Sequence, residues 1–97
     1  MAVKVMLEVK AKPGTGADLV AFFRSILPAT RAHDGCISVE TLQNSDDADD
    51  VAVVEAWESR GQYEKYLAWQ RERGTSAQLM ERLAEPPSIR HFDVTDA

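Results

Sequence analysis

The segment between Val51 and Tyr66 constrains the fold more than any other part of the chain. It reads V-A-V-V-E-A-W-E-S-R-G-Q-Y-E-K-Y, in which an apolar strand ends at Trp57 and leads into an aromatic helix. Small or apolar side chains alternate onto both faces of this strand, so neither face is suited to water. In a short chain the helices can cover only one face of a sheet, and the other face needs a partner. We therefore predict a homodimer.

Composition limits the class of protein. With 97 residues, the chain is predicted to form a single domain, residues 1–97, with one small core. Its formal charge of −5 argues against nucleic acid and anionic membrane as partners, because both need a cationic surface. No apolar run approaches the roughly 18 residues of a membrane span, and a strand pattern begins at the N-terminus without a secretory signal. We expect a cytoplasmic protein whose partner is a small molecule or another protein.

Hydrophobic periodicity predicts the order of the elements. Alternation with a period of two indicates strands, and apolar spacing of three to four residues indicates helices. The predicted strands span residues 3–10, 36–43, 51–58 and 88–94, and the predicted helices span about 17–32, 60–74 and 75–86. Capping boxes are expected at Ser59 with Gln62 and at Thr75 with Gln78. This order predicts an α+β, ferredoxin-like split β-α-β fold with a four-stranded antiparallel sheet.

Metal and nucleotide chemistry have little support in the sequence. The single Cys36 excludes an internal disulfide and a multi-cysteine metal site. Asp46, Asp47, Asp49 and Asp50 lie between two predicted strands without the spacing of an EF-hand, so we interpret them as part of a solvated loop. The chain has no P-loop, dinucleotide fingerprint or nucleophile–base motif. We predict neither a metal nor a cofactor.

Three segments carry a resemblance to a known family: H-D-G-C-I-S-V-E from His33, V-A-V-V-E-A-W-E-S from Val51 and Y-E-K-Y-L from Tyr63. They resemble the antibiotic biosynthesis monooxygenase (ABM) family, whose members are dimeric α+β barrels. The resemblance implies a homodimer in which each subunit has a pocket between sheet and helices. Some members oxidise phenolic or polyketide substrates with O₂ without metal or flavin, some degrade haem, and others act on signalling molecules.

The resemblance also implies pocket residues, position by position. The strand Trp of the polyketide-oxidising members, and the Tyr six residues later, correspond to Trp57 and Tyr63. Val53 replaces an Asn that those members have four residues before the Trp, and Arg82 is a loose candidate for their arginine. The haem-degrading members need a helix His about ten residues after the Trp, where this chain reads Y-L-A. The haem ligand is therefore missing.

A cofactor-free oxygenase must remove a proton from a phenol or enol, because the resulting anion can pass an electron to O₂. A tyrosine hydroxyl, an imidazole or a carboxylate could take that proton. Tyr63 would hydrogen-bond a substrate oxygen and Trp57 would stack on a planar ring; the alternative is that both are core aromatics at the junction of strand and helix. His91, in the last predicted strand, is either a base or substrate anchor or a structural histidine.

Glu55 is the remaining candidate, since it shares a strand face with Trp57. A carboxylate in such a place needs a counter-ion, and Arg24 or Arg90 could supply it. A role in a dimer salt bridge and a role as pocket base both remain open. The predicted catalytic residues are Tyr63 and His91, and the predicted substrate-binding residues are Val53, Glu55, Trp57 and Tyr63.

The resemblance, together with these residues, implies a small cofactor-independent monooxygenase that oxidises an aromatic, quinol or polyketide-like molecule with O₂. Two alternatives remain open. The replacement of the amide by Val53 favours a non-catalytic dimeric barrel that binds a small metabolite or a protein. An isomerase or lyase on the same fold would use His91 as its base.

Overall fold

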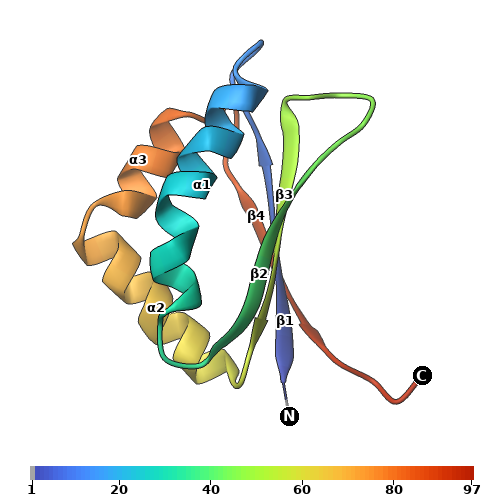
Figure 1. Ribbon diagram of the computed structural model, residues 1–97, viewed down its shortest axis with the longest axis vertical. Helices are drawn as coiled ribbons and strands as arrows, with labels where there is room; N and C mark the ends of the chain where they lie inside the picture. Colours follow the sequence, from blue (N-terminus) through green and yellow to red (C-terminus); the bar gives the residue numbers. More distant parts are fainter. Residues whose placement is uncertain (1) are drawn as a thin grey trace.

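Each predicted strand and helix is present in the computed structural model, which describes residues 2–97 (Figure 1). Along the chain the elements are β1 (Val3–Lys10), α1 (Gly16–Arg31), β2 (Cys36–Gln43), β3 (Asp50–Trp57), α2 (Arg60–Glu72), α3 (Thr75–Glu81) and β4 (Ser88–Asp93). Helices α2 and α3 follow each other closely and together form the second helical connection of the split β-α-β plan.

The four strands form one antiparallel sheet in the order β2-β3-β1-β4. Strands β2 and β3 pair as the predicted hairpin. Because β1 pairs with both β3 and β4, Val5 lies in one row between Glu55 and His91. Side chains in such a row point to the same face of a sheet. The predicted ferredoxin-like α+β fold is confirmed.

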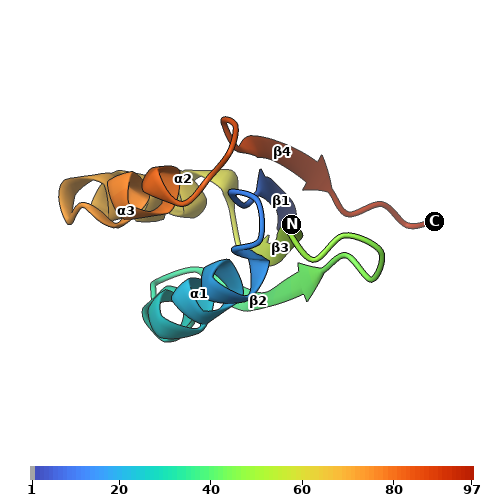
Figure 2. The ribbon, with the colours of Figure 1, turned by 90° about the horizontal axis from the view of Figure 1, so that it is seen from above.

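All three helices lie on one side of the sheet, as Figure 2 shows from above. The strand residues beneath them, such as Val5 and Val53, are almost fully buried. No helix among residues 2–97 covers the other side, which we call the open face. The apolar residues of the open face are Met6, Leu42, Ala52, Val54, Ala56 and Phe92. Among these, Leu42 is 48% exposed and Phe92 is 44% exposed.

Local sequence sets the start of α2 and the junction between α2 and α3. The Ser59 hydroxyl accepts a hydrogen bond from the backbone N–H of Gln62 at 3.2 Å, which confirms the first predicted cap. The second predicted cap is wrong, because Gly74 precedes α3 with φ of 81° and Thr75 is already the first helical residue. Glycine adopts this left-handed conformation at little cost, so α2 can turn directly into α3. Thr75 is thereby buried instead of capping the helix.

The buried side chains form two clusters beneath the helices. The larger cluster joins the sheet to α1 and comprises Val9, Ala11, Leu19, Phe22, Phe23, Leu27, Val39, Val51, Val53 and Leu83. The smaller cluster joins the sheet to α2 and comprises Val5, Trp57, Tyr63 and Tyr66. The two helices therefore cover neighbouring parts of the same sheet face.

Candidate functional site

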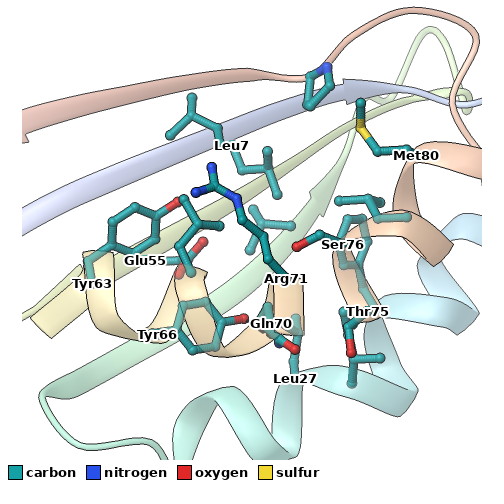
Figure 3. A pocket seen from close by; sticks show the side chains of 17 residues that line it. Leu7, Leu27, Glu55, Tyr63, Tyr66, Gln70, Arg71, Thr75, Ser76 and Met80 are labelled. Carbon is teal, nitrogen blue, oxygen red and sulfur yellow. Dashed lines mark hydrogen bonds between the residues drawn. The ribbon is translucent and has the colours of Figure 1, made fainter. Parts of the chain in front are cut away.

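A cavity of about 280 Å³ lies between the sheet and the three helices (Figure 3). Its lining is mainly apolar. The lining residues are Leu7, Phe23, Ile26, Leu27, Val53, Glu55, Tyr63, Tyr66, Leu67, Gln70, Arg71, Thr75, Ser76, Leu79, Met80, Pro87 and Ile89. A mostly apolar cavity with a few convergent polar groups is the usual form of a small-molecule site. Its volume of about 280 Å³ lies just below the range of about 300–1,000 Å³ for such sites, so it suits a small ring system.

Glu55 is the buried acid of the cavity. It projects from β3, is only 5% exposed, and accepts a hydrogen bond from the indole N–H of Trp57 at 3.0 Å. Burial raises the pKa of its carboxyl from 4.5 to about 7, while the indole hydrogen bond opposes the rise. A carboxyl with this pKa exchanges protons near neutral pH, which suits a general base.

The prediction that an arginine pairs with Glu55 was wrong. Arg90 pairs with Glu8 instead, and both residues lie on the open face, on the other side of the sheet from Glu55. None of the ion pairs found between residues 2 and 97 involves Glu55. With no ion pair to oppose it, desolvation raises the pKa of this carboxyl.

Trp57 lies behind the cavity and not on its wall. The side chain is fully buried, and its ring packs 5.7 Å from the Tyr63 ring and 4.9 Å from the Tyr66 ring, measured between centroids. Since β3 alternates, Trp57 shares the face of Glu55 but lies one row nearer the strand end, where α2 begins. The structure therefore gives Trp57 contact with Glu55 through its N–H, and places no part of it among the lining residues.

Tyr63 lies in the first turns of α2 and lines the cavity. The residue is 3% exposed. Burial raises the pKa of its hydroxyl well above the usual value, the charge of Glu55 adds to the rise, and the charge of Arg71 opposes it. Tyr63 is therefore protonated near neutral pH, and its hydroxyl can donate a hydrogen bond but cannot serve as the base.

His91 contacts Tyr63 without lining the cavity. The two rings pack edge to face with their centroids 5.4 Å apart. The Nδ1 atom of His91 is buried and has no hydrogen-bond partner among the described residues. The structure therefore brings together Val53, Glu55 and Tyr63 of the expected site in the cavity wall, and leaves Trp57 and His91 outside it.

A buried hydrogen-bond chain forms another wall of the cavity. The Tyr66 hydroxyl lies 2.7 Å from the Thr30 hydroxyl and accepts a hydrogen bond from Gln70 Nε2 at 2.9 Å. Tyr66 lines the cavity together with Gln70. The chain joins α1 to α2 and so fixes the separation of these two walls.

Arg71 is the cavity residue that sequence reasoning missed. It follows Tyr63 and Leu67 at a spacing of four residues, so the three share one face of α2. This spacing could have identified it. Arg82, the loose candidate for a pocket arginine, instead lies outside the cavity, with its guanidinium 4.2 Å from the centroid of the Phe22 ring.

The aspartate loop has a structural role. Asp49 accepts hydrogen bonds from the backbone N–H groups of Gly14 and Gly16, both at 2.9 Å, and Asp47 pairs with Lys10. Within residues 2–97 there is no cluster of three His, Cys, Asp or Glu side chains that could hold a metal ion. Across the same residues, none of the helices has the length and apolar character needed to cross a membrane.

The fold and the cavity define a small α+β protein with a site between sheet and helices. The family model for antibiotic biosynthesis monooxygenase matches residues 2–72. The chain belongs to this ABM family. No characterised protein matches the chain by sequence comparison.

Solved structures share the fold over nearly the whole chain. Rv0793 from Mycobacterium tuberculosis is 23% identical, with a TM-score of 0.86 over 100% of this chain and 98% of its own. A conserved protein from Methanosarcina mazei Go1 is 18% identical, with a TM-score of 0.87 over 98% and 94% of the two chains. A variant of SnoaB, a cofactor-independent oxygenase from Streptomyces nogalater, is 12% identical, with a TM-score of 0.85 over 99% and 95%.

Proposed function

We propose that this protein is a cofactor-independent monooxygenase that oxidises a small phenol, quinol or polyketide-like enol with O₂. The observation that carries the proposal is Glu55, a buried carboxyl with a pKa of about 7 at the wall of a mainly apolar cavity. A base whose pKa lies near the working pH combines a useful ionised fraction with useful proton affinity. Membership of the ABM family supports the same chemistry.

With an anthrone-like substrate, the proposed reaction starts from a CH₂ group activated by a phenol or enol. The Glu55 carboxylate removes one proton from it, and the resulting anion passes an electron to O₂. The two radicals combine into a C–O bond, and Glu55 returns its proton to the peroxide. Glu55 then removes the second C–H proton as the O–O bond breaks, which leaves a ketone and hydroxide. The hydroxide takes this proton from Glu55 and leaves as water.

Neighbouring residues support these steps. The Tyr63 hydroxyl donates a hydrogen bond to the substrate oxygen on which negative charge develops, which lowers the energy of the anion. The indole of Trp57 holds the Glu55 carboxyl in one position through its N–H. Val53 leaves an apolar wall where an amide could have bound the anion, so Tyr63 is the proposed donor.

Oxygen uptake with anthrone as the probe tests the proposal. We expect one O₂ consumed for each anthraquinone formed, one ¹⁸O atom in the product when ¹⁸O₂ is supplied, and the same rate with a metal chelator present. Product formation that continues unchanged without oxygen would instead indicate an isomerase or lyase. A ligand-induced rise in melting temperature without turnover would indicate a binding protein.

We further propose that the open face forms a homodimer. Helices shield only one side of the sheet (Figure 2). The other side exposes apolar residues such as Leu42 and Phe92. A sheet face that leaves several apolar side chains exposed often marks an interface. A two-fold axis would place this face against its own copy.

Light scattering at micromolar concentration should give about twice the chain mass of 10.8 kDa. Val54→Arg places a charge in the middle of the open face, opposite Met6 of β1, and should shift the protein to monomers. Ala68→Arg adds the same charge on the exposed outer side of α2 and should leave the dimer intact. A wild-type monomer would refute the proposed interface.

A further inference from the structure

Two charged side chains line the cavity, and they come from different walls. Glu55 projects from β3 and is buried, whereas Arg71 projects from α2 and is exposed to solvent at the mouth. Figure 3 shows the Arg71 side chain extending from its helix toward Tyr63. The charge of Arg71 acts on the Tyr63 hydroxyl, which places the guanidinium within electrostatic reach of the cavity interior.

Arg71 is available to a ligand. It takes part in none of the ion pairs found within residues 2–97. Other arginines are engaged elsewhere: Arg60 pairs with Glu64, Arg90 pairs with Glu8, and Arg73 stacks on the Trp69 ring at 4.3 Å. Arg71 is therefore the cation that a bound molecule would meet on entering the cavity.

The position of Arg71 favours an anionic group on the ligand. A guanidinium presents paired N–H donors that match the two oxygens of a carboxylate, and this contact is stronger beside an apolar wall than in bulk water. The chain as a whole carries a charge of −5, so an anion gains no long-range attraction from the protein. Recognition of an anion must then come from a local contact.

We propose that the cavity selects aromatic hydroxy acids, with Arg71 binding the carboxylate at the mouth while the ring hydroxyl lies inside near Glu55 and Tyr63. This substrate class rests on the proposed function for its chemistry, but its recognition step is independent of oxygen. Arg71 acts as a specificity residue: it holds the end of the substrate that does not react. The apolar lining, including Leu7 and Leu27, encloses the ring between the two charged groups.

Calorimetric titration under nitrogen tests the proposal with three probes, 2,5-dihydroxybenzoate, its methyl ester and hydroquinone. We expect the wild-type protein to bind the acid at least tenfold more tightly than the ester, because only the acid pairs with the guanidinium. Arg71→Gln should remove this preference, and Arg71→Lys should restore part of it. Arg73→Gln, the same change two residues along the helix and outside the cavity, should keep the wild-type preference.

Equal behaviour of the acid and the neutral probes in the wild-type protein, including no binding of any of them at millimolar concentration, would overturn the proposal. Equal loss of preference in the Arg71→Gln and Arg73→Gln variants would overturn it as well. The proposed function fails separately. A retained preference for the acid without oxygen uptake would contradict the oxygenase, whereas oxygen uptake with neutral substrates alone would contradict the role of Arg71.

Discussion

Replacing Glu55 by Gln should lower the turnover number with anthrone by about two to four orders of magnitude, the usual contribution of a positioned general base. Glutamine keeps the shape of the side chain and an oxygen that can accept the Trp57 N–H, so the cavity should retain its form. What is lost is the ability to take a proton. Initial rates of oxygen uptake, with binding of the probe measured in parallel, separate lost chemistry from lost affinity.

The pH profile provides an independent readout of the same base. Since Glu55 must be ionised to accept a proton and its pKa is about 7, kcat/KM of the wild-type protein should rise with pH and level off above about pH 7. Glu72→Gln makes the same chemical change at an exposed position on α2 and should keep both rate and profile. An unchanged rate in the Glu55→Gln variant would remove this carboxyl from the mechanism.

The fold could be predicted because each element carries its own periodicity. Val3 to Lys10 alternates with a period of two, and that strand has the predicted bounds. The Ser59 cap fixed the start of α2 in the same way. The cap assigned to Thr75 was wrong because its alternative, a left-handed Gly74, depends on how two helices meet. The sequence around Thr75 is compatible with both arrangements.

The candidate site could be predicted only in part. Alternation along β3 places Val53, Glu55 and Trp57 on one face, and this much is correct. Alternation does not indicate where along the strand a cavity begins, so it could not separate the lining Glu55 from the buried Trp57. Arg71 was missed because helical spacing identifies a face of α2 but not the space that this face borders.

The electrostatics of Glu55 required the structure. A carboxylate on an apolar strand predicts a partner, and the sequence offers several arginines for that role. The register of β4 against β1 places Arg90 on the opposite face of the sheet. The group that reaches Glu55 is a neutral indole N–H, which satisfies one oxygen without supplying charge. From the sequence alone, Glu55 could form an ion pair or act as a base, and the register of β4 against β1 distinguishes these two roles.

The raised pKa of Glu55 also predicts that the protein becomes less stable as pH rises. The folded state binds the proton more tightly than the unfolded state, so the stabilisation is fully present below about pH 4.5 and is lost as pH rises through about 7. A rise of this size corresponds to a loss on the order of 3 kcal/mol in the free energy of unfolding by pH 8.5. The tyrosines with raised pKa values remain protonated throughout this range.

Urea denaturation between pH 5 and pH 8.5, at one fixed protein concentration, measures this loss. The Glu55→Gln variant carries no titrating group at this position, so the difference between its stability and that of the wild-type protein should grow with pH in favour of the variant. Glu72→Gln should follow the wild-type curve, because Glu72 is exposed. The stability of the wild-type protein relative to the Glu55→Gln variant could instead be the same at pH 8.5 as at pH 5. That result would show that the folded protein does not hold this proton. The base proposed for catalysis would then lack the pKa on which its role depends.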